Sequence, residues 1–163
     1  MRKPIIVGNW KMNKTMKETK EFMEAVDGVA ASDNATYGIG APYTALATAV
    51  AGAKNLIVAA ENCHFEDTGA FTGEVSVPML QEVGVTHCII GHSERRQMFG
   101  DTDETVNKKA KRLIDAGITP ILCIGETEAQ YDAGETEKVI REQLSGSLAN
   151  LCPKCVGNMV IAY

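Results

Sequence analysis

A tetrapeptide near the start of the chain places an amide and an ammonium group at the end of an apolar run. Gly8-Asn9-Trp10-Lys11 follows the run from Pro4 to Val7, so Asn9 and Lys11 stand at alternate positions and can face one side. A lysine in that place could attract a phosphate group or stabilise an oxyanion. Taken alone, the tetrapeptide is explained more simply by a solvated lysine in a loop.

A histidine stands in a similar place, directly after the apolar run that ends at Ile90. Ser93 follows His92 and is a residue type that caps helices, so we expect helix N–H groups near the imidazole. Those groups would disfavour protonation and leave a neutral ring that donates a hydrogen bond. A structural histidine is an equally good explanation by position alone. Glu94, Arg95 and Arg96 would likewise fit an ordinary surface ion-pair group.

The segment from Glu61 to Ser76 has neither helical nor strand periodicity and is long for a loop. Loops of this length are usually functional or disordered, and Phe65 and Phe71 argue against disorder. We expect an apolar loop tip that packs into another surface, such as a second subunit. A surface loop that packs on itself is nearly as good an explanation.

The five cysteines form an odd count, which favours reduced thiols over a disulfide framework. Cys63, Cys88 and Cys123 lie in or beside strand-like runs, where burial is expected. Cys152 and Cys155 form a C-x-x-C pair, for which metal binding would need two more ligands nearby. A redox dithiol is the alternative, but we interpret the isolated pair as a structural coincidence.

Short, nearly continuous apolar runs recur along the chain, with helical patterns between them. Such runs are typical of parallel strands that are buried on both faces by helices. Helical spacing of apolar residues is clearest over about 15–29, 101–117 and 135–148, and weaker helices follow Pro42 and Pro78. The six predicted strands are Pro4 to Val7, Tyr37 to Ala41, Leu56 to Ala60, Cys88 to Ile90, Ile118 to Ile124 and Met159 to Ala162.

A repeating strand–helix order predicts an α/β fold, either a doubly wound sheet or a barrel, and we find no domain boundary within residues 1–163. Polar residues follow the strand ends in both folds, so their position does not choose between them. The first strand is followed by Gly8-Asn9-Trp10-Lys11 and not by a glycine-rich phosphate loop. This absence argues against a dinucleotide-binding sheet.

The charge of the chain, −5 with both signs dispersed, gives no basic footprint for nucleic acid or anionic lipid. A small molecule is therefore the expected partner. The first apolar run is too short for a secretory signal or a membrane span, so we expect a cytoplasmic protein.

Four motifs together closely resemble the triosephosphate isomerase family, in the family's order and spacing. They are Gly8 to Lys11, Gly69 to Glu74, Ile89 to Arg96 and Cys123 to Glu126. The resemblance runs through the whole chain, and the Gly-His-Ser-Glu-Arg-Arg stretch is highly specific. It implies a TIM (β/α)8 barrel, of which residues 1–163 would supply the first five βα units and the sixth strand.

The resemblance also implies a reaction and its residues: dihydroxyacetone phosphate and glyceraldehyde 3-phosphate interconvert through an enediolate, without a cofactor or metal. His92 would be the electrophile, and a neutral histidine in this role is an established feature of the family. Lys11 would supply positive charge to the phosphate and the oxyanion, and Asn9 would help to hold the substrate. The supporting residues would be Glu94, Ser93, Cys123 and Glu126.

Members of the family are homodimers, and the resemblance assigns the interface to the loop from Asn62 to Ser76. Thr72 would support the partner's active-site lysine, with Phe71 in the same interface. Glu61 departs from the glutamine that is commoner at this position, so a carboxyl group would be buried there and dimer stability would depend on pH.

In the family, the catalytic glutamate follows the tyrosine at the end of the sixth strand, which corresponds here to Tyr163. We therefore expect residues 1–163 alone to form an open barrel with unpaired edges, poor solubility and no isomerase activity. A non-catalytic α/β fragment or binding module is the alternative for this polypeptide.

Overall fold

A computed structural model describes residues 3–163 and contains one parallel sheet of six strands. Each strand lies beside its neighbours in sequence, in the order β1-β2-β3-β4-β5-β6. In a doubly wound sheet the order reverses at a switch point, so the sequential order identifies a curled part-barrel. The strands are β1 (Ile5–Asn9), β2 (Thr36–Ala41), β3 (Ile57–Ala60), β4 (His87–Ile90), β5 (Thr119–Cys123) and β6 (Val160–Ala162). All six predicted strands are confirmed.

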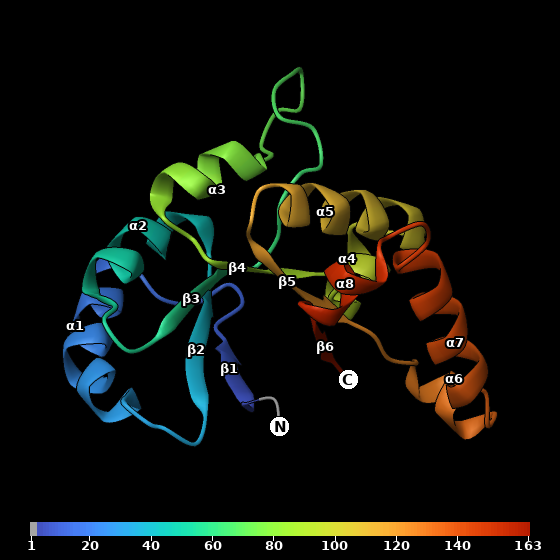
Figure 1. Ribbon diagram of the computed structural model, residues 1–163, viewed down its shortest axis with the longest axis horizontal. Coiled ribbons are helices and arrows are strands. Elements are labelled where there is room, and N and C mark those ends of the chain that lie inside the picture. Colours follow the sequence, from blue (N-terminus) through green and yellow to red (C-terminus); the bar gives the residue numbers. More distant parts are fainter. Residues whose placement is uncertain (1–2) are drawn as a thin grey trace.

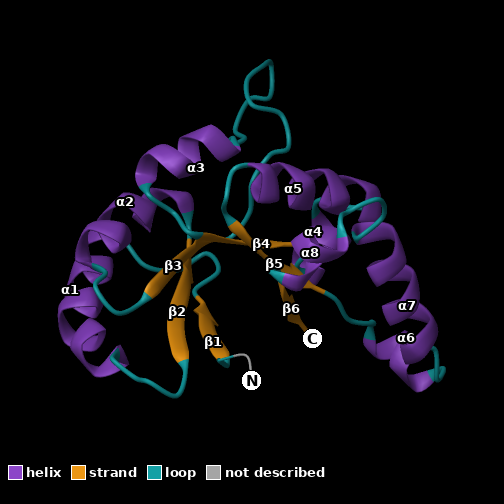
Figure 2. Cartoon of the chain, in the orientation of Figure 1, coloured by secondary structure: helices purple, strands orange, loops and turns teal. Residues whose placement is uncertain are grey.

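The helices lie around the convex side of the sheet and the strands line the concave side (Figures 1 and 2). The helices are α1 (Met16–Val26), the 3-10 turn η1 (Asp27–Ala30), α2 (Tyr43–Gly52), α3 (Val77–Val83), α4 (Ser93–Met98), α5 (Asp103–Asp115), α6 (Glu128–Asp132), α7 (Thr136–Ser147) and α8 (Pro153–Gly157). Among them, none combines the length and the apolar character that crossing a bilayer requires.

Capping side chains set the start of the two clearest helices. At α1, the Thr15 hydroxyl accepts the backbone N–H of Glu18, and the backbone N–H of Thr15 donates to the Glu18 carboxylate. Thr102 and Thr105 form the same reciprocal pair at the start of α5. The α-helix predicted over 15–29 ends earlier, at Val26, because the chain continues from Asp27 as the 3-10 turn η1. The helix predicted over 135–148 is confirmed within one residue at each end.

The main core fills the space between the sheet and the helices, and a smaller apolar cluster lies on the concave face. The small cluster is made of Ala59, Ile89 and Ile121, with Val7, Cys123, Val160 and Ala162 packed against it. Close strand packing explains why β2 contains glycine: a Cβ atom on Gly38 would come within 2.8 Å of the carbonyl oxygen of Ile57.

The edge strands are less covered than the central ones. Successive residues of a strand face opposite sides, so Ile6 and Ile161 face away from the concave cluster that holds Val7 and Val160. They are 55% and 44% exposed, because in residues 3–163 no helix packs over the outer faces of β1 and β6 as helices pack over the central strands. The two ends of the sheet therefore carry exposed apolar side chains.

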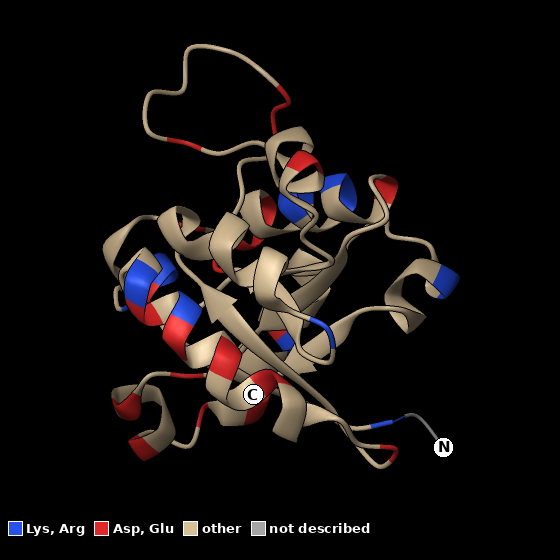
Figure 3. Ribbon diagram, turned by 90° about the vertical axis from the view of Figure 1, so that its left-hand side faces the viewer, with Lys and Arg blue, Asp and Glu red and all other residues tan. Residues whose placement is uncertain are grey.

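Charged residues of both signs are interspersed on α1, and the side of the molecule drawn in Figure 3 has no continuous basic face. Lys17 with Glu21 and Lys20 with Glu24 form i,i+4 pairs along this helix.

The cysteines divide into two classes. Cys63 and Cys88 are buried free thiols, as predicted, whereas Cys123 is a free thiol that is only half-buried. Cys152 and Cys155 form a disulfide, so the prediction of five reduced thiols was wrong for this pair. The helical turn at the start of α8 brings their Cα atoms within 5.1 Å, a separation that a disulfide spans.

Candidate functional site

The strand ends meet around a cavity of about 280 Å³ at the carboxyl-terminal edge of the sheet. Because parallel strands place their carboxyl ends at one edge, residues far apart in sequence converge there. The predicted residues in its lining are Asn9 at the end of β1, Lys11 just beyond it, Glu61 after β3, and His92 and Glu94 after β4. The sequence therefore predicted the main residues of this cavity, which we call the site cavity.

Lys11 reaches into the site with an uncommon backbone conformation. Its φ is 55°, in the left-handed region that side chains with a Cβ atom rarely adopt, and its N–H donates to Oδ1 of Asn9 at 3.2 Å. Its Nζ lies 2.7 Å from Oε1 of Glu94. Strained residues of this kind concentrate at functional sites, where the surrounding structure holds them. The sequence indicated that Lys11 follows a strand, but it did not indicate the left-handed backbone conformation.

His92 itself caps α4, so the prediction of Ser93 as the capping residue was wrong. Nδ1 of His92 accepts the backbone N–H of Glu94 at 3.2 Å, and Ser93 is the first helical residue. A carboxylate oxygen of Glu94 lies farther from the same nitrogen, at 3.5 Å. We assign the ring from the shorter contact: Nδ1 is an acceptor, which leaves the hydrogen on Nε2. Nε2 is thus the ring nitrogen that can donate a hydrogen bond.

Arg96 fastens the backbone next to His92. Its Nε donates to the carbonyl oxygen of Gly91 at 2.7 Å, and its guanidinium also contacts Asp103 at 2.6 Å. Gly91 has a φ of 69°, and a Cβ atom there would lie 3.0 Å from the same guanidinium. Any side chain at this position would therefore crowd the group that holds the His92 loop in place.

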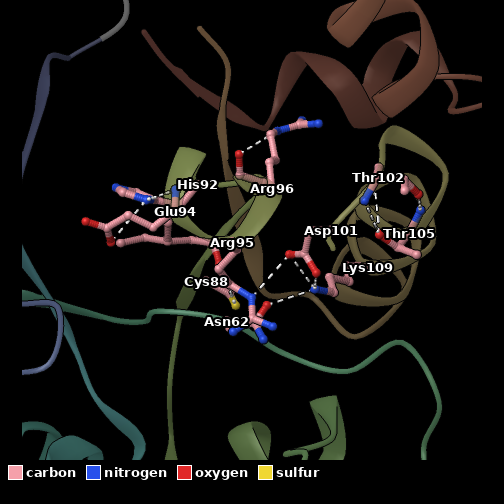
Figure 4. Close-up of polar contacts among 12 residues, drawn as sticks. Asn62, Cys88, His92, Glu94, Arg95, Arg96, Asp101, Thr102, Thr105 and Lys109 are labelled. Carbon is pink, nitrogen blue, oxygen red and sulfur yellow. Dashed lines mark hydrogen bonds and ion pairs between the residues drawn. The ribbon is translucent and has the colours of Figure 1, made fainter. Parts of the chain in front are cut away.

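A second buried network lies behind the site. Nζ of Lys109 contacts both carboxylate oxygens of Asp101, at 2.8 and 2.9 Å, and Oδ1 of Asn62 at 3.0 Å. Nε of Arg95 donates to the same carboxylate at 3.2 Å. Figure 4 shows Arg95 directed to this network, away from Glu94 and His92. Arg95 and Arg96 are half-buried and hold separate networks, so the surface ion-pair explanation does not describe them.

The two carboxyl groups of the site cavity have pKa values shifted in opposite directions. The hydrogen bond and the charge of Lys11 lower the pKa of Glu94. Burial raises the pKa of Glu61 to about 7. The backbone N–H of Lys11 acts in the opposite direction and lowers this pKa, whereas the charge of Glu94 raises it further. Oε1 of Glu61 is buried without a hydrogen-bond partner among residues 3–163, which fits a carboxyl group that binds a proton readily.

His92 also borders a second hollow, of about 200 Å³, on its other side. Ser93 and Cys123 line this hollow, as does Tyr163, so two of the predicted supporting residues lie close to His92. Glu126 lies farther along the same edge, where Oε1 accepts hydrogen bonds from Thr136 at 2.8 Å and Tyr163 at 3.1 Å.

The loop between β3 and α3 projects from the body of the molecule (Figure 1). Within it the His64 ring packs between Phe65 and Phe71, with ring centroids 4.4 and 4.3 Å apart, so the loop does pack on itself. Phe71 is nonetheless 44% exposed and Thr72 is exposed beside it. Neither lines the site cavity of its own chain.

Comparisons with known proteins agree with this geometry. The family model described as triosephosphate isomerase matches residues 4–163. Proteins named triosephosphate isomerase from Alkaliphilus metalliredigens and Acetivibrio thermocellus are 47% and 50% identical to the chain, over 100% and 99% of it. A crystal structure of triosephosphate isomerase from Bartonella henselae superposes with a TM-score of 0.90 at 36% identity, covering 99% of this chain and 68% of that one.

The chain spans 66% and 65% of the lengths of the two curated relatives, so it corresponds to about two thirds of such a protein. The match nevertheless covers every strand of the sheet and all the residues of the site cavity. Sequential parallel strands, a lysine and a histidine at their carboxyl ends and a family match over nearly the whole chain lead to one conclusion: this chain belongs to the triosephosphate isomerase family.

Proposed function

We propose that the full-length protein interconverts dihydroxyacetone phosphate and glyceraldehyde 3-phosphate through an enediolate intermediate. The observation that carries this proposal is the convergence of Lys11 and His92 on one cavity at the strand ends. Moving a proton next to a carbonyl group requires a base, an electrophile for the oxygen and a positive charge for the anionic substrate. The site cavity supplies the last two.

Lys11 and Asn9 are proposed to bind the substrate. The Lys11 ammonium group is half exposed and reaches Glu94 at 2.7 Å, so it is available to a phosphate or an oxyanion at the mouth of the cavity. The Asn9 amide oxygen holds the Lys11 backbone, which leaves the amide nitrogen for the substrate. Glu94 then acts as the counter-ion that orients the lysine.

His92 is proposed to be the electrophile. Its Nδ1 accepts a backbone hydrogen bond, so the hydrogen sits on Nε2 and can be donated to the carbonyl oxygen of the substrate. Arg96 and Gly91 fix the backbone that carries the His92 ring, and Ser93 and Cys123 line the hollow on the other side of this ring. Glu126, bonded to Thr136 and Tyr163, supports the neighbouring edge of the site.

The base is proposed to be the glutamate that follows the sixth strand in the family, outside residues 1–163. Of the carboxyl groups that line the site cavity, Glu94 is bound to Lys11 and has a lowered pKa, which makes it a weak base. Glu61 is the rival, because its pKa of about 7 suits proton abstraction. Residues 1–163 by themselves are accordingly proposed to be inactive, as one part of a larger barrel domain.

The full-length protein is proposed to be a cytoplasmic homodimer that acts in glycolysis and gluconeogenesis without a cofactor, on a small phosphorylated triose. The projecting loop and its exposed Phe71 support a subunit interface that covers residues 62–76. Thr72 would then support Lys11 of the second subunit. A module that binds phosphorylated trioses without turnover is the alternative, and the Lys11–Glu94 arrangement alone would suffice for it.

Replacing His92 by glutamine in the full-length protein tests the proposal. We expect kcat to fall by about 10²–10⁴-fold, the usual contribution of an acid–base group, with a small effect on thermal stability. His87→Gln is the matched control, because His87 begins β4 at the opposite end of the strand and contacts Thr86. It should retain activity. Full activity in His92→Gln would contradict the assigned role, and an inactive wild-type protein that binds triose phosphate would favour the binding module.

A further inference from the structure

A disulfide stands at a place that the proposed reaction does not use. Cys152 and Cys155 flank Pro153 and Lys154 at the start of α8, on the connection between α7 and β6. The same turn is closed by the N–H of Cys155, which donates to Sγ of Cys152 at 3.0 Å. The two sulfur atoms therefore belong to one rigid helical turn, which leads directly into the sixth strand (Figure 1).

Accessibility separates this pair from the other three cysteines. Cys63 and Cys88 are completely buried, and burial raises the pKa of the Cys88 thiol. Cys123 is half-buried, and burial raises its pKa as well. The raised pKa values keep Cys88 and Cys123 protonated and unreactive, because the thiolate is the reactive form, and Cys63 is shielded by its complete burial. Cys152, by contrast, is exposed, and its bonded partner Cys155 is half-buried.

The surroundings of the disulfide offer room and charge for an incoming thiol. A cavity of about 530 Å³ lies against Cys155 and Lys154 and is bounded by Thr119 and Pro120 at the start of β5. The start of β5 is at the end of the sheet opposite to the site cavity. The exposed Lys154 ammonium group attracts an anionic thiolate. Because Cys152 itself is exposed, an external thiol can reach it from solvent without entering the site cavity.

A stabilising role alone explains the disulfide poorly. The ring closed by Cys152 and Cys155 contains only four residues, and stabilisation by loop closure grows with the length of the loop. Metal binding is not favoured either, because no group of three or more histidine, cysteine, aspartate or glutamate side chains within 3–163 is arranged to hold an ion. An accessible bond in a short ring is instead typical of disulfides that open and close.

We propose that Cys152 and Cys155 form a redox-active site that exchanges between dithiol and disulfide with external thiols. The thiolate of the first external thiol attacks the exposed Sγ of Cys152, the bond to Cys155 breaks, and the Cys155 sulfur leaves as a thiolate that takes up a proton. A second external thiol attacks the external sulfur of the mixed disulfide and releases Cys152. Two electrons pass to the protein, two thiols become one external disulfide, and two protons end on the cysteines.

Glutathione is the probe that tests the site in the full-length protein. The protein is equilibrated with mixtures of reduced and oxidised glutathione, quenched with an alkylating reagent and analysed by peptide mass spectrometry. We expect the peptide with residues 152 and 155 to change reversibly by two alkyl groups, while Cys63, Cys88 and Cys123 stay unmodified by glutathione. A disulfide that resists reduction at every ratio until the protein is unfolded would overturn the proposal. Equal modification of all five cysteines would also overturn it.

Two single variants test the direction of attack. Cys155→Ser leaves the exposed sulfur without its resolving partner, so oxidised glutathione should accumulate as a stable adduct on Cys152. Cys152→Ser is the matched control, and its half-buried Cys155 should form the adduct several-fold more slowly. Equal rates in the two variants would contradict the assigned order of the steps. The readout is mass alone, so a failure here is distinct from a failure of the proposed isomerase activity.

Discussion

Glu61 is the residue at which pH acts most directly on the stability of the site. Its folded-state pKa of about 7 lies above the ordinary value of 4.5, so the folded protein binds more protons than the unfolded chain between these pH values. The stability of the fold therefore decreases as the pH rises from about 4.5 to 7, and the cost stays constant above that range. Burial of Oε1 without a partner is the physical cause.

We predict that Glu61→Gln stabilises the full-length protein above pH 7, by about 1 to 2 kcal/mol after allowance for partial exposure to solvent. The amide carries no charge to bury. The measurement is the thermal midpoint as a function of pH, which should flatten between pH 4.5 and 7 in the variant. Glu66→Gln, on an exposed residue of the same loop, is the control and should leave the profile unchanged.

The same variant decides between two possible bases. If the base lies after the sixth strand, as proposed, kcat of Glu61→Gln should stay within a few-fold of the wild-type value. A decrease of about 10²-fold or more, as expected for loss of a general base, would identify Glu61 as the base instead.

Lys11 is predicted to act on both the substrate and Glu94. Lys11→Met removes the positive charge while keeping much of the side-chain length, so kcat/KM should fall by at least about 10²-fold, as for loss of one oxyanion donor. Lys11 is also the main cause of the lowered pKa of Glu94, so that pKa should rise in the variant. An NMR titration of Glu94 measures this effect independently of turnover. An unchanged Glu94 pKa would contradict the 2.7 Å contact.

At the scale of the elements, the carboxylate of Asp27 connects the turn η1 to the segment that leads into β3. Oδ1 of Asp27 accepts the backbone N–H groups of Lys54, Asn55 and Leu56, at 2.8, 2.9 and 3.2 Å. These hydrogen bonds, led by that of Asn55, lower the pKa of Asp27 to about 2. The stability they provide is present above pH 4 and is lost as the pH falls through the folded-state pKa.

We predict that Asp27→Asn destabilises the full-length protein by about 1.5 to 3 kcal/mol at neutral pH, because hydrogen bonds to a charged acceptor are replaced by weaker ones. The variant should lose less stability than the wild type between pH 4 and 2. Urea unfolding at several pH values measures both effects. Asp33→Asn, outside this network, serves as the control, and an equal loss of stability in that variant would argue against the role of Asp27.

The elements were predictable where the pattern of apolar residues is regular. Continuous apolar runs identified every strand. For the central strands the reason is that both faces of the strand are covered. Two features that depend on individual side-chain contacts were not predictable. Lys109 lies within the helical pattern of α5, where a lysine is normally exposed, but it is only 4% exposed and bound to Asp101. His92 displaced Ser93 as the cap because its ring nitrogen reaches the N–H of Glu94.

The sequence predicted which residues belong to the candidate site, but it did not predict their conformations or contacts. Asn9, Lys11 and His92 could be named because they follow strand ends and match a family motif. The left-handed backbone of Lys11 could not, since no local pattern requires it. Likewise, the disulfide at Cys152 depends on the helical turn of α8, which is too short for a clear periodic pattern.

At the scale of the whole molecule, the exposed edges of the sheet determine how residues 1–163 behave alone. Within residues 3–163, β1 pairs only with β2 and β6 only with β5, and both edge strands carry an exposed isoleucine. We predict that residues 1–163, expressed alone, self-associate and have no isomerase activity, because open strand edges favour pairing between chains. Sedimentation measurements over a range of concentrations test this expectation.

A charged side chain on the edge strand provides the control for that experiment. Ile161→Lys should reduce the self-association of residues 1–163 and raise their solubility, because edge lysines oppose strand pairing. A monodisperse monomer of the unaltered polypeptide would contradict the prediction. The full-length protein, which we propose to be a dimer, is the reference.

The sequential strand order also has a consequence for the way in which the chain is made. Within residues 3–163, each strand after β1 pairs with the strand synthesised just before it, so these five pairings need no segment that emerges later from the ribosome. Each pairing spans one strand–helix–strand crossover, as between Ile5 and Thr36, and such a crossover costs less loop-closure entropy than a pairing between strands far apart in the chain. The sheet can therefore grow one strand at a time during translation, with each new helix covering the outer face behind it.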